Sequence, residues 1–343
     1  MDDWALLRAA ADPSFRGALA TVASSAGHAY RKAGAAMLLH ADGRRTGCIS
    51  PGCLEDDLQQ RAERLAGRRT FELVAYNLDP DEDPIWGSEL GCGGVITILL
   101  EPVEGALRRS LVAAWERVRA GEAVRLTRFI AGGTIRYAVV PMGAGAVLPS
   151  AETGALVTTV FLPRPRLILF GAGADVPPIC ETAARIGFRV TVADWRESLL
   201  TPERFPLAES FIAGSDGETL ADALGIGDAD YVLLCSHHIR RERGVLEAVL
   251  PRRPVYIGIL GSRKRVGALL DGLPACDRVR APVGLPIGAV GPEEIAVSIA
   301  AELVAVRSKQ RKAFGKEATR HADTGDLPGG RLRLTAGACE TCG

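Results

Sequence analysis

Apolar residues recur along this chain in two patterns, and the first covers roughly its N-terminal half. Short apolar runs predict strands at 18–24, 35–40, 71–77, 95–100, 124–130, 135–140 and 155–162. Apolar residues spaced by about four predict helices at 4–11, 54–65 and 105–120. Because these strands do not alternate strictly with helices, residues 1–162 are predicted to form an α+β domain.

The second pattern begins near residue 166, where buried strands and helices alternate. Strands are predicted at 167–170, 188–193, 210–213, 231–235 and 255–260, and helices at 179–186, 217–224 and 240–250. A last long helix opens at Gly291-Pro292. This order predicts a Rossmann-like domain over 166–312, with a doubly wound parallel sheet, and gives the whole chain an α/β fold class. Residues 163–165, Pro-Arg-Pro, are predicted to be a stiff hinge. The polar, glycine-rich residues 313–343 are predicted to be a mobile tail.

Charge and composition exclude several partner classes. The 343 residues contain 41 Lys plus Arg and 41 Asp plus Glu, so nothing favours nucleic acid or an anionic membrane surface. No apolar run approaches the roughly 20 residues of a membrane span, and the N-terminus does not resemble a secretory signal. We therefore expect a cytoplasmic protein, in which the eight cysteines serve as thiols or ligands rather than as disulfides.

Cys92 lies in a glycine-rich turn before the strand predicted at 95–100. Gly91, Gly93 and Gly94 surround it, so no neighbouring Cβ hinders a bulky ligand from approaching the sulfur or the backbone amides. This clearance predicts a ligand-binding thiol. The alternative is a buried cysteine that only fills the core before a strand.

Cys53 is the second candidate thiol. It follows Gly52 and lies at the predicted start of the helix at 54–65. A helix N-terminus lowers the pKa of a thiol and favours the metal-binding thiolate, although Glu55 and Asp56 oppose that effect.

The second domain carries part of a dinucleotide-binding fingerprint. Gly171 and Gly173 follow its first strand and Asp194 ends its second, where the fingerprint admits a pyrophosphate and binds a ribose. Val176 occupies the third glycine position, and prolines at 177–178 lack amide donors that a phosphate would use. In the alternative interpretation, Asp194 merely caps the following loop.

Ligands of doubly wound sheets bind at the carboxyl ends of the strands, where further polar residues lie. His237 and His238 follow the fourth strand; on an extended chain they would face opposite sides and would not share a metal, and a structural role is the alternative for each. After the fifth strand come Gly261, Ser262 and Arg263. Ser262 is predicted to cap the next helix, and Arg263 to hold an anion at its positive end.

Together these motifs resemble the xanthine dehydrogenase accessory family (XdhC/CoxI). The resemblance covers about residues 1–310 and rests on the Cys92 stretch with Glu101-Pro102, the turn Pro51-Gly52-Cys53-Leu54-Glu55, the segments 258–263 and 282–285, and the helix at 292–307. Proteins of this family are molybdenum-cofactor chaperones. They bind the molybdopterin cofactor, support its sulfuration with a cysteine desulfurase, and deliver it to a molybdenum hydroxylase.

The resemblance implies a cofactor chaperone rather than an enzyme with turnover of its own. Cys92 and Cys53 are then the candidate metal ligands, because soft thiolates suit a thiol-ligated molybdenum centre, and Cys92 is also a candidate persulfide carrier. The residues expected around the cofactor, with or without a nucleotide extension, are Cys92, Gly91, Gly93, Gly94, Cys53, Gly52, Glu55, Gly171, Gly173, Asp194, His237, Gly261, Ser262 and Arg263. The expected partners are an apo-enzyme of the molybdenum hydroxylase class and a cysteine desulfurase. The sequence leaves open whether the protein forms a homodimer.

Two other functions fit parts of the sequence. The partial fingerprint also suits an NAD(P)-dependent oxidoreductase, although no Tyr-Lys pair or hydride-site acid stands out. Cys339 and Cys342 supply half of the ligands of a structural zinc site. The chaperone hypothesis makes its own structural prediction: the sulfur of Cys92 lies uncovered in a cleft that faces the second domain.

Overall fold

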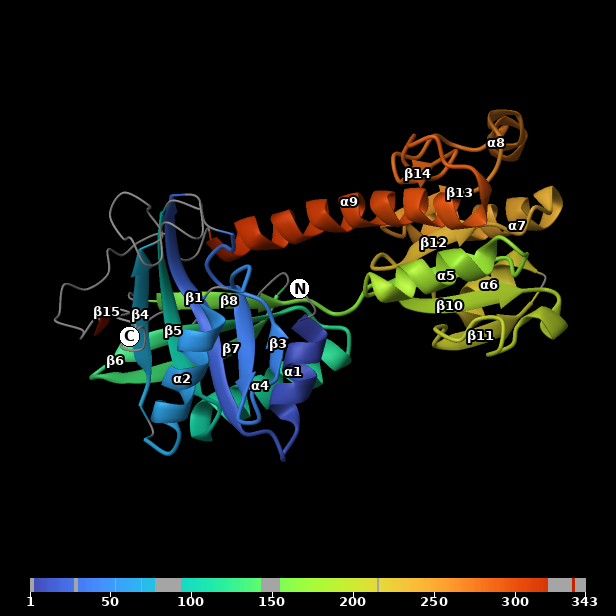
Figure 1. Ribbon diagram of the computed structural model, residues 1–343. Coiled ribbons are helices and arrows are strands. Elements are labelled where there is room, and N and C mark those ends of the chain that lie inside the picture. The colour runs from blue at the N-terminus through green and yellow to red at the C-terminus, as the bar shows by residue number, and fades with distance from the viewer. Residues whose placement is uncertain are drawn as a thin grey trace. The chain divides into compact units, whose positions relative to one another are not determined.

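The computed structural model describes residues 3–27, 30–52, 54–68, 70–77, 94–142, 155–214, 216–319 and 335–336 (Figure 1). The chain divides into two compact units. Unit 1 comprises Met1–Pro163 with Gly315–Gly343, and unit 2 comprises Arg164–Phe314. None of the described helices is long and apolar enough to cross a lipid bilayer.

Unit 1 is an α+β structure, as predicted. Its described helices are α1 (Asp3–Ala11), α2 (Glu55–Leu65) and α4 (Gly105–Arg119). Its described strands are β1 (Gly17–Gly27), β2 (Ala36–His40), β3 (Arg45–Gly47), β4 (Glu72–Asn77), β5 (Gly94–Pro102), β6 (Val124–Ala131), β7 (Thr134–Pro141), β8 (Ala155–Phe161) and β15 (Thr335–Ala336). One sheet has the order β15-β4-β5-β1-β2-β3 and a second has the order β7-β6-β8. Apart from the parallel β15–β4 pair, the pairs are antiparallel.

Strand β1 shows how the alternation of side chains builds two cores on one sheet. Ala20 and Val22 pack on the side of Leu58 from α2. Leu19 points the other way and packs with α1, α4 and strand β6 of the second sheet. Because successive residues of a strand face opposite sides, one apolar run supplies both cores. This explains why the first domain shows apolar runs rather than polar–apolar alternation.

Unit 2 contains the predicted alternation of strands and helices. Its strands are β9 (Arg166–Phe170), β10 (Arg189–Asp194), β11 (Ser210–Ala213), β12 (Tyr231–Leu234), β13 (Tyr256–Ile259) and β14 (Val279–Arg280). Its helices are α5 (Val176–Arg185), α6 (Gly217–Ala223), α7 (Ile239–Val249), α8 (Arg263–Leu270) and most of α9 (Gly291–Thr319), with short 3-10 turns η1 (Glu197–Leu199) and η2 (Leu250–Arg252). The strands form one parallel sheet in the order β11-β10-β9-β12-β13-β14. The prediction of a doubly wound sheet is confirmed.

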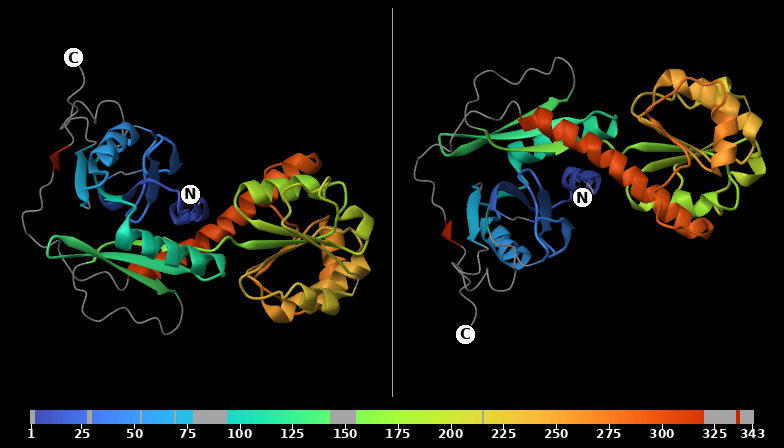
Figure 2. Two further views of the ribbon diagram at one scale, coloured as in Figure 1. Left: turned by 90° about the horizontal axis from the view of Figure 1, so that it is seen from below. Right: turned by 90° about the horizontal axis from the view of Figure 1, so that it is seen from above.

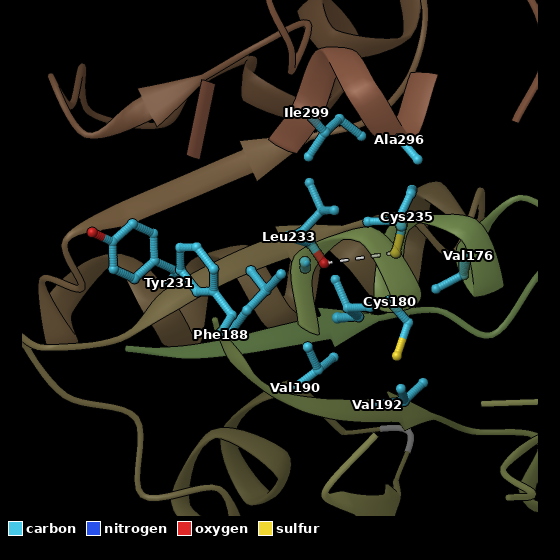
Figure 3. Packing of buried hydrophobic residues seen from close by; sticks show 14 of the residues in the cluster. Val176, Cys180, Phe188, Val190, Val192, Tyr231, Leu233, Cys235, Ala296 and Ile299 are labelled. Carbon is cyan, nitrogen blue, oxygen red and sulfur yellow. Dashed lines mark hydrogen bonds between the residues drawn. The ribbon is translucent and has the colours of Figure 1, made fainter. Parts of the chain in front are cut away.

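Helices cover both faces of this sheet, as Figure 2 shows. One face packs against α5 and α9, in a cluster that includes Cys180, Phe188, Leu233 and Ile299 (Figure 3). The other face packs against α6, α7 and α8. Because both faces are buried, the strands are apolar at nearly every position. From β9 the chain adds β10 and β11 on one side of the sheet, and then returns to add β12, β13 and β14 on the other side of β9. The direction in which strands are added therefore reverses between β9 and β12.

The C-terminal region differs from the prediction of a tail starting at residue 313. Helix α9 continues to Thr319, through a segment that contains the helix formers Ala, Lys and Glu. Thr335–Ala336 pairs with β4. The other residues of the predicted tail, with Cys339 and Cys342, lie outside the described part of the chain.

Candidate functional site

The predicted site residues of unit 1 flank or precede β5 and α2. Gly94 opens β5, where it pairs with Gly27 of β1. Cys92, Gly91, Gly93 and Cys53 lie outside the described residues. The exposure of the Cys92 sulfur and its direction toward the second domain therefore stay predictions.

The loop before α2 is organised by a buried carboxylate. Glu55 is only 4% exposed and accepts hydrogen bonds from the backbone N–H of Ser50 (3.2 Å) and of Leu54 (3.0 Å). It also accepts one from the Ser50 hydroxyl, whose oxygen in turn accepts from the N–H of Gly52 (3.2 Å). Hydrogen bonds thus hold the backbone of both Gly52 and Leu54, the residues on either side of position 53. The carboxylate of Glu55 points into the loop, which gives this residue a positioning role.

Glycine is needed at position 52 for its backbone conformation. Gly52 has φ +128°, a region that other residues rarely adopt. Among the described residues, no atom lies within 4 Å of a Cβ added at this position.

Cys48 is a further thiol of this loop that the sequence analysis did not select. Its Sγ donates to the carbonyl oxygen of Ser50 (2.9 Å), and the residue is half-buried. The signal was present in the sequence, since Cys48 stands five residues before Cys53.

By contrast, Cys180 and Cys235 are buried in the core of unit 2 (Figure 3). Burial raises the pKa of Cys180 to about 12, so this thiol stays protonated.

In unit 2 the predicted residues gather at the carboxyl ends of the parallel strands. Gly171 follows β9 with φ +133°, and an added Cβ would lie 2.5 Å from the carbonyl oxygen of Cys235. The close approach of β12 therefore requires glycine here. At Gly173 an added Cβ would lie 2.8 Å from Oδ1 of Asp175. Packing requires glycine at position 171, where the neighbour is backbone, whereas the neighbour at Gly173 is the end of a side chain that can move.

Asp194 takes the loop-capping arrangement. Its carboxylate is fully buried and accepts from the N–H of Ala172 (2.7 Å) and of Arg196 (2.8 Å), and from the Arg196 guanidinium (3.0 and 2.9 Å). Burial alone would raise the pKa of Asp194, but these hydrogen bonds outweigh it and hold the pKa below its usual value. The carboxylate presents no surface to a ribose.

The two histidines after β12 have different roles. His237 adopts a left-handed conformation, φ +58°, so the prediction of an extended chain at this point is wrong. Its Nε2 lies 2.7 Å from Oδ2 of Asp175, which joins the loop after β12 to the loop after β9 where the strand order reverses. His238 instead caps α7, with Nδ1 accepting from the N–H of Arg241.

The conformation of this loop has an identifiable cause in Glu242, which the sequence analysis did not select. This fully buried carboxylate accepts from the N–H (2.7 Å) and hydroxyl (3.0 Å) of Ser236 and from the N–H of His237 (3.0 Å). Arg265 of α8 donates to its other oxygen (2.5 Å). The carboxylate thus fixes the loop that carries His237.

A basic, aromatic group lies at the same edge and was also missed. The guanidinium carbons of Arg196 and Arg241 lie over the Trp195 ring, at 4.4 and 4.8 Å from its centroid. The ring of His238 meets Trp195 edge-on at 5.4 Å. Such cation–π contacts hold the guanidinium groups in place. Trp195 and Arg241 are 46 positions apart in the sequence, so only the fold reveals their contact.

The remaining predicted residues lie between β13 and α8. Gly261 precedes Ser262, whose Oγ accepts from the N–H of Arg265 (3.3 Å), so the predicted N-cap is confirmed. Arg263 is exposed in the first turn of α8. Among the described residues, no group of three or more His, Cys, Asp or Glu side chains is placed to hold a metal ion.

Comparisons with known proteins match both parts of the chain. A model described as the XdhC and CoxI family matches residues 12–77, and a model described as the XdhC Rossmann domain matches residues 167–303. A Bacillus subtilis protein described as a probable xanthine dehydrogenase subunit is 34% identical over 310 residues, which are 85% of this chain and 93% of that protein.

Two further relatives span most of the chain. The molybdenum cofactor insertion chaperone PaoD of Escherichia coli is 27% identical over 301 residues, which cover 86% of this chain and 84% of that protein. A crystal structure of a xanthine dehydrogenase from Bacillus halodurans matches with a TM-score of 0.80 and 35% identity, over 90% of this chain and 96% of that chain.

Proposed function

Because this chain belongs to the XdhC and CoxI family, we propose that it binds the molybdenum cofactor and delivers it to an apo-enzyme of the xanthine dehydrogenase type. In this role it is a chaperone without turnover of its own. The likeness to PaoD, which is described as a molybdenum cofactor insertion chaperone, supports the proposal over most of the chain.

One structural observation carries the proposal: the buried Glu55 fixes the loop on both sides of Cys53. Its bonds to Ser50 and Leu54 hold this loop at the N-terminus of α2. A helix N-terminus favours a thiolate, although Glu55 and Asp56 in its first turn oppose that effect. The cofactor, when bound, supplies a soft, dithiolene-ligated molybdenum, which thiolates suit. Cys53 and Cys92 are the proposed ligands. We further propose that the protein supports sulfuration of the cofactor, with a cysteine desulfurase as the sulfur donor and a persulfide carried on Cys92.

The strand ends of unit 2 offer groups that fit an anionic, heteroaromatic cofactor. Arg241 lies over Trp195, so a cationic and an aromatic surface adjoin; Arg196 lies over the same ring, but its guanidinium is paired with Asp194. Arg263 is exposed and directly follows the Ser262 cap. Guanidinium groups are well suited to hold the phosphate of the pterin side chain or of a nucleotide extension.

The ligand assignment is tested with the variants Cys92→Ala and Cys53→Ala and the double variant. Each is co-expressed with the cofactor pathway and purified, and bound molybdenum is measured by mass spectrometry and bound pterin by fluorescence after oxidation. We expect each single variant to retain several-fold less of both and the double variant to retain almost none. Cys180→Ala, which changes a buried core thiol, is the matched control. Unchanged retention in the double variant would refute the cysteine assignment.

The role of Glu55 is tested separately, because it positions the loop. Glu55→Ala leaves the N–H groups of Ser50 and Leu54 and the Ser50 hydroxyl without this acceptor. We expect a loss of about 1–3 kcal/mol in the free energy of unfolding and weaker cofactor retention. Asp56→Ala, an exposed acid of the same helical turn, should change neither. Full retention by the destabilised Glu55→Ala protein would show that the loop does not hold the cofactor.

A further inference from the structure

Unit 1 contains a cavity that the proposed cysteine ligands do not account for. It has a volume of about 480 Å³ and lies between the first turn of α4, the end of β5 and strand β7. Phe71, Ile135 and Tyr137 supply apolar and aromatic walls, and Glu101 supplies a carboxylate. The volume is within the range of small-molecule sites, which are mostly apolar with a few placed polar groups. Glu101 belongs to the Glu101-Pro102 motif, to which the sequence analysis gave no function.

The carboxylate of Glu101 is held in a buried network. Arg128 of β6 donates through Nε to one oxygen (2.8 Å), and the Tyr137 hydroxyl donates to the other (2.7 Å). Both Glu101 and Arg128 are almost fully buried, so their charges cancel beside the cavity. Burial and the neighbouring Glu101 raise the pKa of Tyr137, so its hydroxyl keeps its proton.

A purely structural ion pair between the two sheets would explain part of this network. However, it would not require the cavity, and the pairing is incomplete. Arg128 also donates to Thr159 Oγ1 (3.1 Å), while its buried Nη2 meets no acceptor within the described part of the chain. A buried donor without a partner costs about 1–3 kcal/mol.

The first turn of α4 adds hydrogen-bond donors to the mouth of the cavity. The first amides of a helix have no partner inside the helix. The N-cap residue Glu104 does not bond them with its side chain. Gly105, Ala106 and Leu107 all line the cavity. The cavity therefore combines donors at its mouth with an acceptor at the Tyr137 hydroxyl oxygen, which retains a free lone pair, while the Glu101 carboxylate lies buried behind that hydroxyl.

We propose that this cavity binds a planar heteroaromatic ring that carries N–H donors beside a carbonyl, the edge that pterin and guanine share. An N–H group faces the hydroxyl oxygen of Tyr137, the carbonyl meets the amides of α4, and the ring faces lie against Phe71 and Ile135. The choice of a pterin rests on the proposed function, whereas the shape and polarity of the cavity do not. In this proposal the cavity takes the organic part of a cofactor.

The inference is tested by calorimetry on full-length protein freed of small molecules. The probes are 6-carboxypterin, GMP, and AMP as the ligand that lacks the N–H and carbonyl edge. Ala106→Phe fills the mouth of the cavity. Tyr137→Phe removes the hydroxyl and its hydrogen bond to one oxygen of Glu101, while the bond from Arg128 Nε to the other oxygen remains. Tyr76→Phe is the matched control, because Tyr76 donates to Asp57 (2.5 Å) in the same unit but does not line the cavity.

We expect wild-type protein and Tyr76→Phe to bind 6-carboxypterin or GMP, with affinity at least tenfold lower in Ala106→Phe and Tyr137→Phe and no binding of AMP. Tighter binding of the pterin assigns the cavity to the pterin ring, and tighter binding of GMP assigns it to the guanine of a dinucleotide form. Absence of binding by both, equal binding of AMP, or equal affinity in all variants would overturn the inference. Wild-type protein that retains molybdopterin but binds no free ring would overturn it while leaving the proposed function intact.

Discussion

Single buried carboxylates fix the loops of both candidate regions. Glu55, Asp194 and Glu242 each accept hydrogen bonds from two backbone amides. Those of Glu55 and of Glu242 come in each case from one loop, and those of Asp194 from the loops after β9 and β10. A carboxylate that accepts from backbone donors in the interior stabilises one loop conformation, since losing it leaves those donors unpaired. The charge is balanced for Asp194 by Arg196 and for Glu242 by Arg265. These carboxylates therefore fix the loops that carry the other candidate site residues.

The lowered pKa of Asp194 predicts a specific dependence of stability on pH. Because the folded-state pKa lies below the unfolded value of about 4, the contribution is fully present above that value and is lost as pH falls through the folded-state pKa. Urea unfolding at pH 7, 4 and 3 should show this loss. Asp194→Asn should be less stable at pH 7 and should lose less on acidification. Asp228→Asn, which changes an exposed acid, is the control. If the free energy of unfolding of Asp194→Asn fell with pH as steeply as that of the wild-type protein, Asp194 would not be the source of this pH dependence.

At the residue scale the sequence predicted local bonds better than contacts between loops. The Ser262 cap follows from a serine before a helix, and the structure contains it. The left-handed conformation of His237 was not foreseen, because it depends on Glu242, in the following helix, and on Asp175 from another loop. The contact of Arg241 with Trp195 also joins separate loops. Such contacts exist only once the sheet has aligned its strand ends.

At the scale of elements, the start of α5 is poorly suited to a pyrophosphate. In dinucleotide-binding folds this helix N-terminus offers free amides and a positive dipole end to the phosphates. Here Pro177 and Pro178 lie in the first turn and have no N–H. The carboxylate of Asp175 stands at the N-cap and binds His237. The periodicity of apolar residues thus predicted the Rossmann-like fold, but the start of α5 lacks the free amides that bind phosphate in dinucleotide-binding proteins of this fold.

This geometry predicts that NAD(P) binds weakly or not at all. Calorimetric titration of NAD, NADH, NADP and NADPH should give no dissociation constant below about 1 mM, since a negative carboxylate replaces the phosphate donors and Asp194 is enclosed. Asp175→Gly, which removes that charge, should improve affinity if the helix N-terminus can still accept a phosphate. Micromolar binding of any of these dinucleotides by the wild-type protein would restore the oxidoreductase alternative.

At the scale of the whole molecule, each unit has a complete core of its own. Both clusters that cover the parallel sheet are built from residues of unit 2, from Leu167 to Leu303. The clusters of unit 1 that contain β1 and α4 are built from residues before 163. The apolar periodicity revealed both cores because each strand and helix buries a regular face. It could not reveal the cavity beside Glu101, which forms where the residues before β4, the end of β5, the start of α4 and strand β7 meet.

Unit 2 is therefore expected to fold as an isolated fragment, residues 164–314. It should unfold cooperatively in urea and give a dispersed amide NMR spectrum, because its two clusters remain intact. A fragment that ends at residue 290 lacks α9 and with it Ala296, Ile299 and Leu303, which pack against one face of the sheet. Burial of the two larger side chains contributes about 1.5–3 kcal/mol each, so this shorter fragment should lose cooperative unfolding. If the fragment 164–314 failed to fold while the full chain unfolded in a single transition, unit 2 would depend on unit 1 for its stability.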